Sequence, residues 1–220
     1  LEYDPLPPQK TKFTDLCVMV LDKSGSMDLV RNDTIGGVNA FLDKQKEGGD
    51  DLLFTLITFN IRAETVMRVI PITDVPKFTR DNYVPAGGTA LFDAIEYAVR
   101  ETEYALVALD TKIKPTLVVV SDGEENSSKL STELGGERAL KHIRDLLKRK
   151  QEDGWTVVYL NSDDAGFSAG ASMGFSPHNT YHYAAADMVG TFAVMASANN
   201  AHRTAVRDGT AVADGYFPTP

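Results

Sequence analysis

Carboxylate and hydroxyl side chains follow an apolar segment near the start of the sequence. In "DLCVMVLDKSGSMD", residues 15–28, the apolar run ends at Asp22, and Ser24 and Ser26 follow at alternate positions. A turn would account for polar residues here, but it would not account for this mixture of oxygen atoms. Oxygen atoms are the ligands that hard cations such as Mg²⁺ prefer. The segment is therefore a candidate metal-binding loop.

Two other segments place oxygen ligands in a similar way. Thr89 lies in "PAGGTALFDA" at the start of a helical pattern, and Asp122 lies in "VVVSDGEEN" directly after an apolar run. Taken alone, Thr89 would be interpreted as a helix N-cap, and Asp122, which precedes a glycine, as part of a turn. Together with the first segment they supply two carboxylates and three hydroxyls, which coincidence explains poorly.

Apolar runs of strand length alternate with helical patterns along the chain. The short connection "NIRA" joins two of these runs and predicts a hairpin. Strands that are apolar on both faces, separated by amphipathic helices, predict a doubly wound α/β domain with a mostly parallel sheet, helices on both faces and one antiparallel edge strand. The predicted strands are 16–21, 52–59, 64–70, 115–121, 155–160 and 180–184, and the last two predicted helices are 164–173 and 187–207, the second of them ended by Gly209.

The predicted fold brings the oxygen ligands to one place. In open α/β sheets, ligands bind beyond the carboxyl ends of the strands, which is where these side chains fall. Hydroxyls carry no charge, so a cation that takes three of its ligands from hydroxyls is only partly neutralised by its direct ligands. If one aspartate binds through water, the metal becomes a better acceptor for an outside carboxylate. Zinc is not indicated, because Cys17 is the single cysteine and the four histidines show no metal-ligand pattern.

These segments resemble the metal-ion-dependent adhesion site of von Willebrand factor A domains. "DKSGS" from Asp22, "GGTAL" around Thr89 and "VSDGEEN" around Asp122 match its order and wide separations, and the resemblance covers roughly residues 14–205. It implies that Ser24 and Ser26 coordinate the metal directly and that Thr89 joins in the ligand-binding state. It also implies that Asp22 and Asp122 act directly or through water, and that a partner's acidic residue takes the sixth position.

The resemblance implies a non-enzymatic protein-binding domain that docks a partner's Asp or Glu through Mg²⁺, with Mn²⁺ or Ca²⁺ as alternatives. In its overall sequence the chain resembles short stand-alone A domains of bacteria and their phages. A structural or assembly component of a prokaryotic or phage complex, with a purely structural metal, stays open as a second reading. A metal-dependent phosphohydrolase is a third, but such enzymes of the haloacid dehalogenase type need a second aspartate where this chain has Ser24.

Composition excludes other classes of function. A net charge of −9 and a pI near 4.9 argue against binding nucleic acid by general electrostatics. The longest apolar runs are too short to span a membrane. With one cysteine and no signal-like start, the chain is expected to be cytoplasmic, although a sequence that begins with Leu leaves a removed signal peptide open. We expect an extended arm at 1–13, an A domain at 14–208 and a C-terminal tail at 209–220.

Three neighbouring features have plainer interpretations. Asp28 is expected to be a solvated helix start rather than part of a second metal site. Glu124 and Glu125 are expected to be exposed loop charges. Gly36 and Gly37 each cost a helix about 1 kcal/mol, and close packing of that helix against the sheet would justify them.

Overall fold

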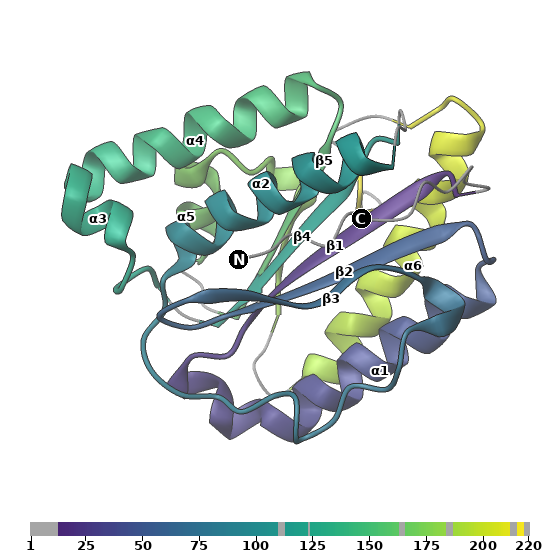
Figure 1. The fold of residues 1–220 in the computed structure, drawn as a ribbon, viewed down its shortest axis with the longest axis horizontal. Coiled ribbons are helices and arrows are strands. Elements are labelled where there is room, and N and C mark those ends of the chain that lie inside the picture. Colours follow the sequence, from purple (N-terminus) through teal and green to yellow (C-terminus); the bar gives the residue numbers. More distant parts are fainter. Residues whose placement is uncertain are drawn as a thin grey trace.

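The computed structural model describes residues 13–109, 113–122, 124–162, 166–183, 187–211 and 215–217. The predicted arm at 1–13 therefore lies outside the described residues except for Phe13. Within the described ranges the chain forms a central sheet with helices on both of its faces (Figure 1). This confirms the predicted doubly wound α/β class.

A six-stranded sheet forms the middle layer of the described structure. Its strand order is β3-β2-β1-β4-β5-β6, so β1 lies inside the sheet between β2 and β4. All neighbours pair in parallel except β2 and β3, which are antiparallel and form the predicted edge hairpin. The strands are β1 (Asp15–Asp22), β2 (Leu52–Phe59), β3 (Ala63–Pro71), β4 (Thr116–Ser121), β5 (Thr156–Asn161) and β6 (Thr180–His182).

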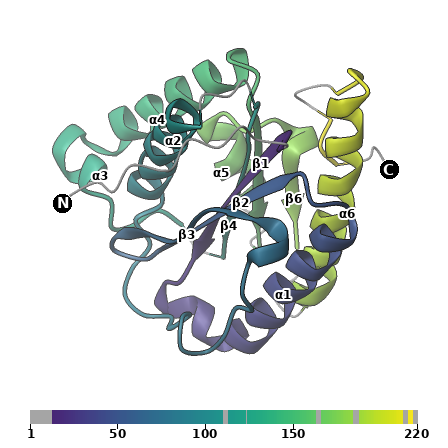
Figure 2. The same ribbon diagram turned by 45° about the vertical axis from the view of Figure 1, so that its right-hand side comes forward.

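The helices form the two outer layers. Figures 1 and 2 show α1 and α6 together on one face of the sheet and α2, α4 and α5 on the other. The α-helices are α1 (Arg31–Glu47), α2 (Leu91–Ala108), α3 (Lys129–Leu134), α4 (Gly136–Glu152), α5 (Gly166–Met173) and α6 (Met188–Arg207), and the 3-10 helices are η1 (Gly25–Val30), η2 (Ile72–Asp74) and η3 (Pro177–Asn179). The sequence pattern did not predict α3.

Strand β1 shows why its sequence is apolar throughout. Successive side chains of a strand point to opposite faces, and both faces of this sheet are covered. Cys17, Met19 and Leu21 belong to the core beneath α1 and α6, whereas Val18 and Val20 belong to the core beneath α2 and α4. All eight residues of β1 are buried, including the aspartates at its two ends.

The sequence predicted that Gly36 and Gly37 allow their helix to pack closely against the sheet, and this prediction is wrong about what the helix packs against. A β-carbon on Gly37 would lie 2.4 Å from Cδ2 of Phe192, so this glycine allows α1 to approach α6 rather than the sheet. At Gly36 a β-carbon would meet nothing nearer than Val189 at 4.0 Å, so packing does not require that glycine. Close helix–helix contact behind the sheet is the physical reason for Gly37 alone.

The end of the chain contributes to the core. Asp187 caps α6 by accepting a hydrogen bond from the backbone amide of Gly190 at 3.0 Å, and Gly209, with a φ of +70°, follows the helix as predicted. In the predicted tail at 209–220, Tyr216 is buried and its hydroxyl reaches the backbone carbonyl of Met195 on α6 at 3.4 Å. The division at 14–208 stays a prediction.

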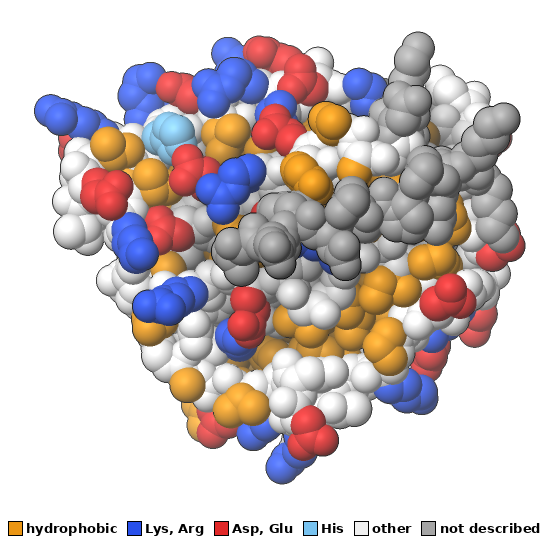
Figure 3. All heavy atoms as spheres, viewed as in Figure 1, with side chains coloured by type: hydrophobic (Ala, Val, Ile, Leu, Met, Phe, Trp, Pro, Cys, Tyr) orange, Lys and Arg blue, Asp and Glu red, His pale blue; other side chains and the backbone are white. Residues whose placement is uncertain are grey.

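Two findings bear on the excluded classes of function. No helix within the described ranges combines the length and the hydropathy that crossing a bilayer requires. On the face drawn in Figure 3, acidic and basic side chains are interspersed, and the described basic ones do not merge into one continuous surface. This arrangement agrees with the acidic net charge.

Candidate metal centre

Asp22 ends β1 and is held there by three hydrogen bonds. Its Oδ1 accepts from the backbone amide of Ser24 at 2.6 Å, and its Oδ2 accepts from the hydroxyl of Ser121 at 2.6 Å. The hydroxyl of Tyr83 donates to the backbone carbonyl of Asp22 at 2.6 Å. Both carboxylate oxygens are thus oriented by neighbours, and the side chain is fully buried.

A chain of hydroxyls links this loop to the loop after β4. The hydroxyl oxygens of Ser24 and Ser26 lie 3.1 Å apart, and the hydroxyl of Ser26 donates to Oδ1 of Asp122 at 2.8 Å. Ser26 and Asp122 are 96 positions apart in the sequence. The parallel pairing of β1 with β4 brings their carboxyl ends to the same edge, which is why these loops meet.

Thr89 is positioned through its backbone. Its amide donates to Oδ1 of Asn126 at 2.9 Å, and its carbonyl accepts from the amides of Asn126 and Ser127 at 3.0 and 3.2 Å. The residue is buried, yet its hydroxyl makes no hydrogen bond within the part of the chain that the structure describes. Helix α2 begins at Leu91 with Ala90 in the N-cap position, so the N-cap interpretation of Thr89 is wrong.

Backbone hydrogen bonds join the loop of Thr89 to the loop of the two serines. The amide of Gly25 donates to the carbonyl of Gly87 at 2.9 Å, and the amide of Ala86 donates to the carbonyl of Lys23 at 2.9 Å. The loop after β1, the loop before α2 and the loop after β4 therefore form one connected surface. All five predicted site residues lie in or directly beside these loops.

Gly88 allows the closest of these contacts. A β-carbon at this position would lie 2.1 Å from the hydroxyl oxygen of Ser127, a distance that no side chain tolerates. The preceding Gly87 has a φ of +80°, a left-handed conformation that glycine adopts without strain. The pair of glycines in "GGTAL" thus has a steric reason and a conformational reason.

Glu125 has a structural role that the sequence interpretation missed. Its carboxylate accepts hydrogen bonds from the amide of Phe92 at 3.1 Å, in the first turn of α2, and from the amide of Ser128 at 2.7 Å. The hydroxyl of Ser128 adds a third bond at 2.6 Å. The expectation of an exposed loop charge is confirmed for Glu124 but is wrong for Glu125, which is half-buried. The serines after "EEN", which can cap a helix, were the available signal.

Asp28 lies in η1 and is exposed, which confirms its interpretation as a solvated residue at the start of a helix. Tyr83, in contrast, is a buried residue that supports the site and that no sequence pattern indicated. Its position depends on the long connection between η2 and α2, which has no periodic pattern from which a contact with Asp22 could be predicted.

Burial acts on both carboxylates of the site. Burial raises the pKa of Asp22 to about 6, and the nearby charge of Asp122 contributes in the same direction. Burial also raises the pKa of Asp122, although its hydrogen bond from Ser26 opposes that shift. Neither aspartate forms an ion pair within the described part of the chain.

The donor set suits a hard cation. Two carboxylates and three hydroxyls supply oxygen atoms only, which fits Mg²⁺ better than a metal that prefers thiolate or imidazole. The described residues contain no group of three or more His, Cys, Asp or Glu side chains that could hold a metal. A cation here would therefore depend on the hydroxyls of Ser24, Ser26 and Thr89.

Comparison with solved structures identifies the fold. The vWF domain of the type V pili tip protein Mfa5 from Porphyromonas gingivalis matches with a TM-score of 0.61 and 11% identity, covering 86% of this chain and 96% of that chain. The von Willebrand factor type A protein from Catenulispora acidiphila matches with a TM-score of 0.59 and 14% identity, covering 86% of this chain and 43% of that chain. This chain therefore has a von Willebrand factor A-like fold.

A third match is a metal-bound protein. Proximal thread matrix protein 1 from the mussel byssus, solved with a zinc-occupied MIDAS motif, matches with a TM-score of 0.58 and 12% identity, covering 83% of this chain and 47% of that chain. This chain spans 63% or less of the length of several other solved chains that it matches. No family model and no curated protein matches the sequence. The expected cytoplasmic location stays a prediction, since pilus and byssus proteins do not support it.

Proposed function

We propose that this chain is a non-enzymatic binding domain that docks an acidic residue of a partner protein through Mg²⁺. In this proposal Asp22, Ser24, Ser26, Thr89 and Asp122 hold the ion, directly or through water. The partner's carboxylate completes its coordination. The fold is that of von Willebrand factor A proteins, which supports the proposal.

The observation that carries the proposal is the unused bonding capacity at one edge of the sheet. The hydroxyl of Thr89 makes no hydrogen bond among the described residues, and burial raises the pKa values of both Asp22 and Asp122. A divalent ion would offset both charges at once. If one of the aspartates binds through water, the direct ligands of the ion carry less negative charge, and the ion can accept a further carboxylate.

Metal binding can be measured without knowing the partner. Mn²⁺ is the probe, and the proton relaxation of water reports how much of it the protein binds. We expect one Mn²⁺ site, with Mg²⁺ as a competitor. In Asp22→Ala the affinity should fall by about 100-fold or more, because the variant loses one of only two anionic ligands.

Asp28→Ala is the matched control, because Asp28 is an exposed aspartate in the neighbouring η1 and should leave Mn²⁺ affinity unchanged. Acetate and a glutamate-containing peptide then test the open position, since a carboxylate that replaces bound water lowers the relaxation enhancement. Absence of Mn²⁺ binding to the wild type would overturn the proposal. Binding of Mn²⁺ without any effect of carboxylates would favour the structural or assembly reading.

A further inference from the structure

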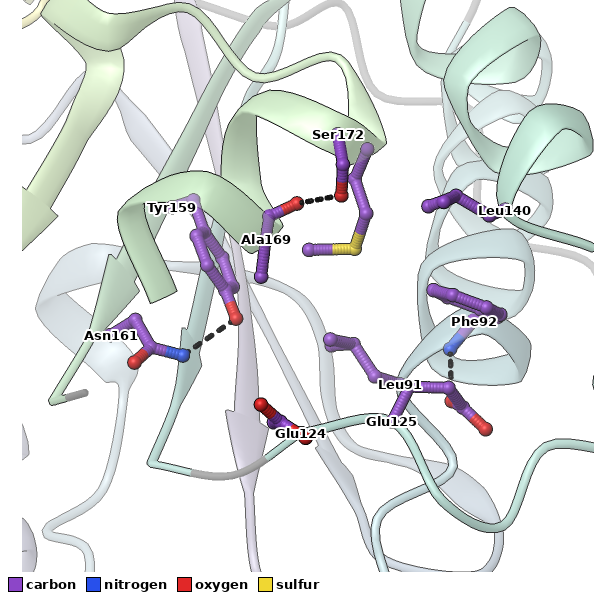
Figure 4. Close-up of a pocket in the computed structure, with 10 residues that line it drawn as sticks. Leu91, Phe92, Glu124, Glu125, Leu140, Tyr159, Asn161, Ala169 and Ser172 are labelled. Atoms are coloured by element: carbon purple, nitrogen blue, oxygen red, sulfur yellow. Dashed lines mark hydrogen bonds between the residues drawn. The ribbon is translucent and has the colours of Figure 1, made fainter. Parts of the chain in front are cut away.

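A cavity opens beside the candidate metal centre. It has a volume of about 210 Å³ and lies between α2, α4, α5 and the carboxyl end of β5. Figure 4 shows side chains from these elements converging on it, with the loop after β4 along one border. Metal binding as described above does not use this cavity.

The interior of the cavity is largely apolar and well ordered by packing. Leu91 and Phe92 come from the first turn of α2, Leu140 from α4 and Met173 from α5. The hydroxyl of Tyr159 forms part of the wall and accepts a hydrogen bond from the side-chain amide of Asn161 at 2.7 Å. Pockets for drug-sized ligands typically occupy roughly 300–1,000 Å³, so this smaller cavity suits one long side chain.

Two glutamates border the cavity, and they differ in availability. The carboxylate of Glu125 is occupied by the amides of Phe92 and Ser128. Glu124 is exposed, and within the described part of the chain it forms neither a hydrogen bond nor an ion pair. Figure 4 places Glu124 at the border of the cavity, across from Ala169 and Ser172. An apolar interior with a free carboxylate at its border fits an aliphatic stem that ends in a positive charge.

The cavity and the metal centre share two loops. Leu91 lies two residues after Thr89, and Glu124 lies two residues after Asp122. Two residues span at most about 7 Å of extended chain, so one short segment of a partner can reach both places. The net charge of −9 on the whole chain also favours a cationic group on the partner.

We infer that this cavity binds a lysine or arginine side chain of the partner, a few residues from the acidic residue at the metal. The apolar stem lies against Leu91, Phe92 and Met173, and the charged end meets Glu124. This inference rests on the proposed function for the identity of the partner. The cavity itself recognises the basic side chain without the metal.

The test uses a small probe in place of the unidentified partner. Nα-acetyl-lysine N-methylamide is titrated into protein with labelled methyl groups, and nuclear magnetic resonance follows the methyls of Leu91, Leu140 and Met173. Nα-acetyl-norleucine N-methylamide is the matched neutral probe with the same stem. We expect the lysine probe to shift these methyls with a dissociation constant of roughly 1–10 mM, as burial of a short aliphatic stem allows. It should bind roughly fivefold more tightly than the norleucine probe.

Variants separate the parts of the inference. Glu124→Gln should reduce lysine binding to the norleucine level, whereas Glu133→Gln, an exposed acid on α3, should not. Ala169→Phe, which fills the cavity from α5, should abolish the shifts for both probes. Equal binding of both probes, or methyls that do not shift, would overturn the inference.

The same titration is repeated on Asp22→Ala and in EDTA, and lysine binding should persist in both. If lysine binds while the Mn²⁺ experiment fails, the cavity stands and the proposed function falls. If Mn²⁺ binds while the lysine probe shows no preference for Glu124, the proposed function stands and this inference falls.

Discussion

The two ends of strand β1 carry the same kind of residue in opposite electrostatic settings. At the amino end, Asp15 is buried beside Asp51, and both face Arg203, whose side chain is 3% exposed. Arg207 adds a second cation to Asp51 at 3.1 Å. At the carboxyl end, Asp22 and Asp122 face only hydroxyls and backbone amides among the described residues.

The fold supplies its own positive charge at the amino end of β1. The arginines at the amino end come from α6, which packs beside α1 and reaches that edge of the sheet. A hydrogen bond from the Thr14 hydroxyl and, after it, the two arginines hold the pKa of Asp51 below its usual range. At Asp15, burial outweighs the Thr14 bond and Arg203 and raises the pKa. Among the described residues, no basic side chain pairs with the aspartates at the carboxyl end. Arginines therefore pair with the aspartates at one edge of the sheet and not at the other.

Removing the internal cation should have the largest effect on stability. Arg203→Met leaves Asp15 and Asp51 without their buried partner, so the free energy of unfolding should fall by about 3–5 kcal/mol. Urea denaturation measures it. Arg207→Met is the matched control at a side chain that is 40% exposed, and it should cost less than about 1 kcal/mol. Equal losses in the two variants would contradict the interpretation that Arg203 is the main counter-charge of the aspartates at the amino end of β1.

Adding Mg²⁺ should stabilise the folded protein through the loops at the carboxyl end of β1. Mg²⁺ at about 100 times its dissociation constant should raise the free energy of unfolding by about 2.7 kcal/mol, because it binds the folded state alone. Asp122→Asn keeps the shape of the side chain but lacks the charge, and it should lose most of this gain. A thermal melt with and without Mg²⁺ measures both. A similar gain in the variant would place the ion elsewhere.

The support beneath the metal loops can be tested next. Glu125→Gln places an amide group against the donors of Phe92 and Ser128, so it should lower the free energy of unfolding by about 1–2 kcal/mol. Mn²⁺ affinity should fall as well, because Thr89 is held by the same loop. Glu124→Gln is the adjacent control and should change stability by less than about 0.5 kcal/mol. No difference between the two variants would mean that Glu125 does not organise the loop.

The smallest expected effect is the pH dependence of the stability that Asp51 contributes at the amino end of β1. The folded-state pKa of Asp51 is lowered, so its stabilising contribution is present above its ordinary value near 3.8 and is lost as the pH falls through the lower folded value. Asp51→Asn should therefore cost about 1 kcal/mol at pH 7 and less near pH 3. Urea denaturation at the two pH values is the measurement. A cost that grows in acid would reverse the assigned sign.

Much of the architecture followed from pattern alone. Continuous apolar runs in β1, β4 and β5 indicated strands buried on both faces, and the run after "NIRA" gave the antiparallel edge strand. Helix α3 was not predicted, because its six residues bury no side chain and so show no apolar periodicity. Local sequence also could not identify Phe192 as the neighbour of Gly37, since that contact joins helices far apart in the chain.

The residue types of the site and their order are read directly from the sequence. That these residues meet at one edge could also be predicted, because parallel strands bring their carboxyl ends to the same edge of a sheet. Only the tertiary structure decided how those residues are held: the Tyr83 bond to Asp22, the Asn126 bonds to Thr89 and the Glu125 cap on α2. It also decided which of the described aspartates pair with an arginine and which do not. Hydrogen bonds and charge pairs depend on distances across the fold, and no spacing along the chain encodes those distances.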